Sequence, residues 1–179
     1  MGIRASATAE IIFEDCFVPD SARVGKEGRG FMIAMQTLQM SRPVVAAISV
    51  GIAQAAIEAA VAYSHHRKQF GVKIATFEMV QQMIADMVMK TEAARIFTYK
   101  ACVAQMNKDK KAGLYSAMSK CFASDTAMEV TTTAVQVMGG NGYSRENPVE
   151  KYMRDAKIMQ IYEGTNQVQR LFIANETTF

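Results

Sequence analysis

The chain has 179 residues, of which 50% are hydrophobic and 21% are charged, and its formal net charge is +3. This length and composition are typical of one globular domain with enough apolar side chains for a buried core. Basic and acidic residues are interleaved, and the only short basic run lies at residues 108–111, so nucleic acid is not an expected partner. No run of 18 uncharged apolar residues occurs, which predicts that no segment spans a membrane.

The three cysteines, Cys16, Cys102 and Cys121, are odd in number and far apart, which indicates reduced thiols in a reducing compartment. We expect a bacterial cytoplasm because no transit segment is recognisable, or the mitochondrial matrix if the protein is eukaryotic. His65 and His66 are adjacent, whereas two ligands on one helix face need i, i+4 spacing, so no metal site is expected.

Residues 8–18 are rich in β-branched and aromatic side chains with partial alternation, and residues 19–21 close them as a turn. This pattern predicts one strand or two short ones. A lone strand does not form a stable sheet, so two interpretations stay open. The segment packs on the rest of the chain as an arm, or it is the end of a sheet whose other strands lie outside this sequence.

From residue 31 onward, apolar residues recur at the i, i+3, i+4 and i+7 positions of a helix. The pattern predicts five helices, at residues 31–66, 76–108, 113–138, 148–159 and 165–175. Pro43 is expected to disturb the first helix, whose residues 44–61 are small enough for close packing. Long helices joined by short loops predict an all-α fold, an up-and-down antiparallel bundle with a short β segment at the N-terminus.

The loop at residues 67–71 follows the first predicted helix and carries residues that a turn does not need. Arg67 offers a fork of donors suited to a phosphate, Gln69 an amide, and Phe70 a ring face for stacking. The alternative is a plain helix terminus with Gly71 as its cap.

Residues 136–143 contain three glycines in four positions, which let main-chain N–H groups approach an anionic or heterocyclic ligand closely. This segment follows a helix and not a strand, so it is not a Rossmann fingerprint. A plain helix-ending turn is the alternative interpretation.

The segment at residues 160–167 presents Glu163 beside Gly164, with Thr165 as a good N-cap of the helix that follows. Glu163 is either an acid that complements the helix dipole or a group placed to accept a proton. Together, the three loops indicate a binding site for a nucleotide-type cofactor next to a base.

Five motifs, at residues 41–47, 67–71, 136–143, 150–157 and 161–170, resemble the C-terminal half of acyl-CoA dehydrogenases, especially the short- and medium-chain branch. The resemblance implies that residues 25–179 form the C-terminal helical bundle domain of that family. It also implies that residues 1–24 are a remnant of the middle β-domain, and that most of this domain is absent from the chain.

The resemblance implies that Glu163 is the catalytic base, which removes the α-proton of an acyl-CoA thioester while the β-hydrogen leaves as hydride to FAD. Ser41 stands where other branches of the family carry their base, and serine cannot take that role. Arg42 is implied to lie near the CoA portion, with Tyr162 and Gly164 beside the acyl thioester. These residues, with Ser41, are the expected substrate-binding set.

The resemblance also implies FAD contacts. Arg67, Gln69 and Phe70 correspond to residues that reach the FAD of a neighbouring subunit, and a second strip meets its adenosine end. The strip comprises Gln136, Val137, Met138, Gly139 and Gly140, and Thr165 and Gln167 are further FAD contacts. Two positions depart from the family pattern: Gln39 stands where close relatives often carry an acid, and Glu78 where many carry glutamine.

The expected partners are an acyl-CoA substrate, an electron-transfer flavoprotein, and further copies of the chain in a dimer or tetramer. The chain alone is expected to be weakly active or inactive, because the missing middle domain holds most of the flavin ring. Two alternatives stay open: a non-catalytic helical oligomerisation module, and an acyl-CoA oxidase.

Overall fold

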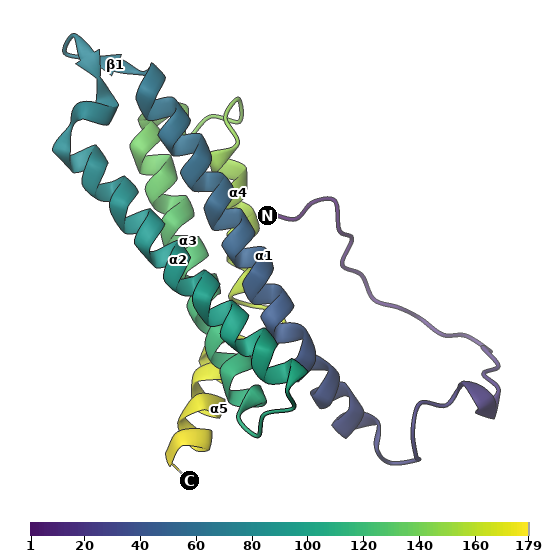
Figure 1. The fold of residues 1–179 in the computed structure, drawn as a ribbon. Coiled ribbons are helices and arrows are strands. Elements are labelled where there is room, and N and C mark those ends of the chain that lie inside the picture. The colour runs from purple at the N-terminus through teal and green to yellow at the C-terminus, as the bar shows by residue number, and fades with distance from the viewer. Residues whose placement is uncertain (179) are drawn as a thin grey trace.

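The computed structural model describes residues 1–178, and in this range five α-helices form the molecule. Three long helices lie side by side with alternating directions, a shorter helix packs antiparallel to the third, and the last helix extends from one end (Figure 1). The all-α bundle predicted from the sequence is confirmed. The helices are α1 (Gly30–His66), α2 (Glu78–Met106), α3 (Ala112–Met138), α4 (Val149–Met159) and α5 (Asn166–Thr178).

The predicted boundaries of the first four helices agree with the structure to within two residues, and α5 ends three residues later than predicted. Short 3₁₀ turns lie at Asp20–Ala22, Ile74–Thr76 and Gly139–Asn141. The agreement follows from the strong helical period of the apolar residues, which a buried face imposes on each helix.

The core lies mainly between α1 and α3, whose contact is the most extensive in the bundle. Small side chains dominate it, which lets the two backbones approach closely. The alanines in this contact are at most 1% exposed: Ala46, Ala53, Ala56 and Ala60 of α1, and Ala123, Ala127 and Ala134 of α3. The four alanines of α1 in this contact all lie within residues 44–61, the stretch whose small side chains were expected to pack closely.

Pro43 lies inside α1, yet the helix is continuous through it. A proline has no N–H to donate to the carbonyl four residues earlier, which here belongs to Gln39. The Gln39 carbonyl instead accepts a hydrogen bond from Nε2 of Gln105 on α2, at 3.1 Å. The neighbouring α2 therefore satisfies the backbone group that Pro43 leaves free, and ties α1 down at this point.

A small β-hairpin, which the sequence did not predict, follows α1. Strands β1 (Lys68–Gln69) and β2 (Val72–Lys73) pair antiparallel across the two residues Phe70 and Gly71, with φ of +50° and +83°. Left-handed values at both central positions are those of a type I′ turn, which matches the twist of a hairpin. Gly71 is therefore the second turn residue, and its interpretation as the cap of α1 was wrong.

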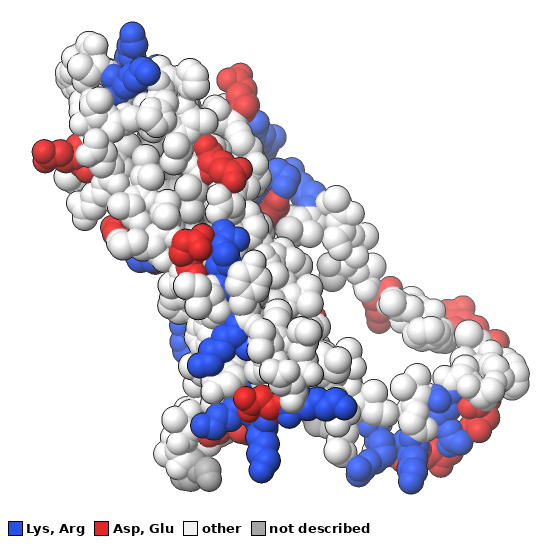
Figure 2. Space-filling view, viewed as in Figure 1, with Lys and Arg blue, Asp and Glu red and all other residues white. Residues whose placement is uncertain are grey.

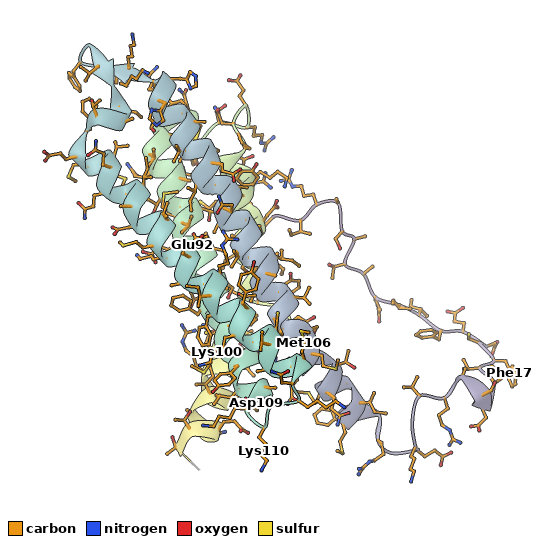
Figure 3. All side chains as sticks on the ribbon, viewed as in Figure 1. Phe17, Glu92, Lys100, Met106, Asp109 and Lys110 are labelled. Carbon is orange, nitrogen blue, oxygen red and sulfur yellow. The ribbon has the colours of Figure 1, made fainter. Side chains whose placement is uncertain are left out.

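The strand predicted at residues 8–18 is not formed. This segment is exposed and runs away from the bundle, with Phe17 at its outer bend (Figures 1 and 3). The physical reason is that no other strand lies beside it to accept its hydrogen bonds. Residues before it are anchored: Ile3 N–H donates to Asp155 Oδ1 at 2.6 Å on α4, and Arg154 Nη1 donates to the Met1 carbonyl at 2.7 Å.

α1 is long and apolar enough to cross a membrane, with a mean hydropathy of 1.9 over its most apolar 18 residues. This is weak evidence, since the core helix of a soluble protein passes the same criterion. In the structure, 44% of that window is buried inside the bundle. On the face shown in Figure 2, acidic and basic side chains are interspersed, and basic ones gather at the lower end of the bundle.

The α2–α3 contact gives a first test of the core. Met87 is 2% exposed within the main apolar cluster, whereas Met89, two residues later, is 62% exposed. We expect Met87→Ala to lower the free energy of unfolding by about 2–5 kcal/mol, because it leaves a cavity in a packed core. The matched control Met89→Ala should change it by less than about 0.5 kcal/mol. Urea unfolding measures both, and equal losses would contradict this assignment of the core.

Candidate functional site

The connection between α4 and α5 is a tight turn in an unusual backbone conformation. Glu163 and Gly164 are both left-handed, with φ of +59° and +88°, and the turn is closed by Asn166 N–H donating to the Gln160 carbonyl at 3.0 Å. A glycine adopts this region freely, but a glutamate does so at a cost in free energy. Such strain persists only where surrounding contacts fix the backbone, and it is often found at functional sites.

Three side chains fix this turn by donating to its carbonyl groups. Gln169 Nε2 donates to the carbonyls of Glu163 and Gly164, at 3.2 Å each, and Lys120 Nζ donates to the Gly164 carbonyl at 2.9 Å. Arg42 Nε lies 3.5 Å from the Glu163 carbonyl. The donors come from α5, α3 and α1, so the bundle as a whole determines the conformation of the turn.

The Glu163 carboxylate points toward α1, where the Ser41 hydroxyl donates to its Oε2. Arg42, the next residue on α1, is only 5% exposed, and its guanidinium lies 5.8 Å from the centre of the Phe172 ring. Burial lowers the pKa of Arg42, and the negative charge of Glu163 opposes this effect. The structure thus brings together Ser41, Arg42 and Glu163, which the sequence predicted as one site.

Tyr162 and Gly164 are the sequence neighbours of Glu163 in this turn. The Tyr162 hydroxyl donates to the sulfur of Met159 at 2.8 Å. Burial, and then the charge of Glu163, raise the pKa of Tyr162, so it stays neutral over the ordinary pH range. Thr165 is the N-cap of α5, because its Oγ1 accepts from Val168 N–H at 3.3 Å, which confirms that prediction.

A buried polar network, which the sequence did not reveal, lies behind the turn. The Lys120 side chain is fully buried, and its Nζ also donates to Asn166 Oδ1 at 2.8 Å. Asn166 Nδ2 in turn donates to Ser124 Oγ and Asp125 Oδ1, at 2.8 Å each. Burial is the main reason that the pKa of Lys120 falls from 10.5 to about 8.

Asp125 joins this network to α5 and to the end of α4. Its carboxylate accepts from Gln160 Nε2 and from Arg170 Nη2, at 2.6 Å each. Burial opposes its ionisation, but the hydrogen bonds from Arg170, Gln160 and Asn166 outweigh burial and lower its pKa. One sequence signal for the network existed: Lys120 lies on the helix face of the buried Ala117, Ala123 and Ala127, where a charge needs partners.

A second group of predicted residues meets at the opposite end of the bundle. Arg67 and Gln69 of the hairpin, with Val137, Met138, Gly139 and Gly140 after α3, line a cavity of about 320 Å³. Its polar groups suit a phosphate or a heterocycle, and Gly139 has a φ of +60°. Phe70 is 93% exposed, lies outside this cavity with its ring 6.3 Å from that of Phe77, and Gln136 is exposed.

The two groups are far apart in one chain. Ser41 and Arg67 are 26 residues apart in sequence, most of them in α1, which corresponds to roughly 39 Å at 1.5 Å per residue. The structure therefore does not bring the hairpin to Glu163. Gln167 is exposed on the first turn of α5, and Glu78 is exposed at the start of α2.

Gln39 lines a further cavity, of about 470 Å³, at the end of the bundle where α2 joins α3. Lys108, Asp109 and Lys110 of the α2–α3 connection also line it, and Figure 3 shows the last two at this end of the bundle. Across residues 1–178, no three His, Cys, Asp or Glu side chains are grouped as a metal site.

A five-helix bundle with a carboxylate fixed before its last helix and a glycine-lined cavity at its far end defines a domain class. Residues 28–177 match the family model described as the C-terminal domain of acyl-CoA dehydrogenase. The chain belongs to the acyl-CoA dehydrogenase family, and the resemblance noted in the sequence is confirmed.

Relatives and solved structures agree with this assignment. The chain is 53% identical over 174 residues to the probable acyl-CoA dehydrogenase FadE25 of Mycobacterium tuberculosis, covering 97% of this chain and 45% of the relative. It is similar to butyryl-CoA dehydrogenase of Megasphaera elsdenii, with a TM-score of 0.91 and 48% identity over 94% of this chain and 44% of that one.

A chain in a structure of the electron transferring flavoprotein of Acidaminococcus fermentans is also similar, with a TM-score of 0.90 and 54% identity, over 93% of this chain and 44% of that one. The chain thus spans less than half the length of these relatives.

Gly164 gives a test of the turn. A Cβ at this position would lie 2.4 Å from Gln169 Nε2, and its φ of +88° is unfavourable for alanine. We expect Gly164→Ala to lower the free energy of unfolding by about 1–3 kcal/mol. The control Gly51→Ala, in the interior of α1 with nothing within 4 Å of the new Cβ, should instead raise it by about 0.5–1 kcal/mol. Chemical denaturation measures both, and a stabilising Gly164→Ala would show that the turn is not held as described.

Lys120 gives a test by pH. Its pKa is lower in the folded chain, so between about pH 8 and 10.5 the unfolded chain binds more protons and the free energy of unfolding rises with pH. Relative to Lys120→Met, which lacks this titration, the wild type should gain about 2 kcal/mol between about pH 7.5 and pH 10. Urea unfolding at several pH values measures the difference, and parallel curves for the two proteins would contradict a depressed pKa.

Proposed function

We propose that the chain is the C-terminal domain of an FAD-dependent acyl-CoA dehydrogenase and that Glu163 is its catalytic base. One observation carries the proposal: the Glu163 carboxylate is fixed at a strained turn, with Ser41 donating to it and the buried Arg42 beside it. A carboxylate with one oxygen held by a neutral donor keeps the other oxygen available to accept a proton.

In this proposal Glu163 removes the α-proton of an acyl-CoA thioester. Arg42 lies near the CoA portion, where its buried guanidinium favours negative charge, and Tyr162 and Gly164 lie beside the acyl thioester. The neutral Tyr162 ring adds apolar surroundings on one side. Ser41 positions the carboxylate and does not take the proton.

FAD, when bound, supplies the acceptor for the hydride that leaves the β-carbon. The cavity between the hairpin and the glycines after α3 fits part of this cofactor, because Arg67 suits a phosphate and Gln69 and the Gly139–Gly140 backbone suit polar ring edges. Val137 and Met138 also line this cavity, and Phe70 and Gln136, which lie outside it, are further proposed contacts to FAD. Thr165 and Gln167, at the start of α5, are further proposed contacts to FAD.

The distance of roughly 39 Å between Ser41 and Arg67 along α1 supports a homo-oligomer, a dimer or tetramer. The hairpin cavity of one subunit then meets the adenosine end of the FAD whose flavin lies at the Glu163 of a neighbouring subunit. Each complete site would use two copies of the chain.

Three further proposals follow from the family. Residues 1–24 correspond to the end of the middle β-domain, and contacts to most of the flavin ring come from outside this chain, so its activity alone is weak or absent. The next electron carrier is an electron-transfer flavoprotein. The location is a bacterial cytoplasm, or the mitochondrial matrix if the protein is eukaryotic.

Deuterium exchange tests the role of Glu163 without requiring the flavin. In D₂O, a base that removes the α-proton of butyryl-CoA should return a deuteron to the same carbon, which mass spectrometry detects. We expect Glu163→Gln to slow this exchange by about 10²–10⁴-fold, the usual contribution of a general base. The control Glu176→Gln, at an exposed position of α5, should leave the rate unchanged. A wild-type rate above that of butyryl-CoA without protein, and equal to the rate of Glu163→Gln, would refute the assignment.

The visible spectrum with added FAD tests the oxidation itself. A flavin band that bleaches with butyryl-CoA in the wild type, and not in Glu163→Gln, is the result expected of an active chain. A colourless multimeric chain without α-proton exchange would leave the family membership standing and show that this chain by itself is a non-catalytic helical oligomerisation module. Reoxidation of the bleached flavin by oxygen as fast as turnover would identify an acyl-CoA oxidase.

A further inference from the structure

Lys120 is a fully buried charged side chain to which the proposed proton transfer gives no role. It lies in the middle of α3, on the face that also carries buried alanines. An isolated ammonium in such a place is costly, so the fold retains it only where acceptors compensate the charge. A methionine of similar length would fill the same space without this cost.

Both acceptors of the Lys120 amine belong to the turn that carries Glu163. The amine donates to the Gly164 carbonyl at 2.9 Å and to Asn166 Oδ1 at 2.8 Å. These residues lie on either side of Thr165, the N-cap of α5. One rigid group of α3 therefore holds the turn on both sides of the start of α5.

The second acceptor is itself fixed. Asn166 donates to Ser124 Oγ and to Asp125 Oδ1, and its N–H donates to the Gln160 carbonyl. Because Asn166 cannot move independently of α3, the Lys120 amine is aimed at the Gly164 carbonyl. The only other side chain that donates to this carbonyl, among the described residues, is Gln169.

The conformation that these bonds hold decides where Glu163 points. With φ of +59° at Glu163 and +88° at Gly164, the carboxylate meets Ser41 on α1. A relaxed φ at Glu163 would turn the side chain away from α1, because side-chain direction follows the backbone. The strain at Glu163 favours that relaxation unless the carbonyls that follow are restrained.

We propose that Lys120 is a positioning residue, whose buried amine holds the Glu163–Gly164 turn in the left-handed conformation that directs the carboxylate to Ser41. It acts through the Gly164 carbonyl and Asn166, and it does not touch the reacting atoms. The importance of the Glu163 position for proton abstraction rests on the proposed function, but the restraint of the turn by Lys120 does not.

Amide hydrogen exchange tests the restraint directly. Lys120→Met keeps the length of the side chain and removes its donors. We expect the Asn166 amide, which closes the turn, to exchange about tenfold faster in this variant, because the lost bonds came from a charged donor. Amides of α1 near Ala53 and Ala56 should be unchanged. The matched control is Thr131→Val, at a fully buried position of α3 where the hydroxyl bonds only to α3 itself, and it should leave the Asn166 amide unchanged.

A conservative variant separates positioning from general stability. Lys120→Arg retains donors and should restore slow amide exchange at Asn166 at least in part. The ¹³C chemical shift of the Gly164 carbonyl should differ from the wild type in Lys120→Met and return toward the wild-type value in Lys120→Arg. Exchange that is unchanged in Lys120→Met, or faster by the same factor throughout the chain, would overturn the proposal.

A further measurement keeps the proposal falsifiable if Lys120→Met does not fold. In the wild type, the Lys120 ammonium protons should exchange slowly and correlate with the Gly164 carbonyl carbon, and a solvent-like exchange rate would overturn the proposal. The restraint and the catalytic role can fail separately. If Glu163→Gln loses α-proton exchange, Glu163 is upheld as the base. If Lys120→Met keeps α-proton exchange although its turn is mobile, the restrained position of Glu163 is not important for proton abstraction.

Discussion

The close contact between α1 and α3 is the constraint on which the rest of the structure depends. Buried alanines in both helices let the backbones approach closely. The contact sets Ser41 and Arg42 of α1 opposite Lys120 of α3, and the turn at residues 160–165 lies between them. The site is therefore a consequence of helix packing, and it is built on rigid elements.

The backbone carbonyls of the turn are as important as the carboxylate that it carries. They accept hydrogen bonds from side chains of three helices, which offset the cost of a left-handed glutamate. Behind them, Asp125 with its lowered pKa and Arg170 supply opposite charges at the border of the network. A buried network of this kind is stabilising only when its members are satisfied, and Lys120, Asn166 and Asp125 each have partners.

The two groups of predicted site residues, one around Glu163 and one at the hairpin cavity, lie at different ends of the bundle. Glu163 lies near one end and the hairpin cavity near the other, and α1 is stiff over the whole distance. The hairpin turn, with Phe70 and Gly71 both left-handed, presents Arg67 and Gln69 at a fixed place on this far end. In the proposed oligomer, the two ends of one bundle contact two different FAD molecules.

The sequence by itself determined the five helices and placed Glu163 just before the N-cap of the last one. Helical period and capping residues are local properties, so no tertiary contact is needed to recognise them. The sequence also indicated that Ser41, Arg42 and Glu163 form one site, through a family resemblance. Only the tertiary structure decided that residues 8–18 form no strand, since pairing needs a neighbour, and that residues 68–73 form a hairpin. It alone revealed Lys120 as part of the site, because burial and the distance to Gly164 depend on how α3 and the turn pack, and no local pattern encodes that contact.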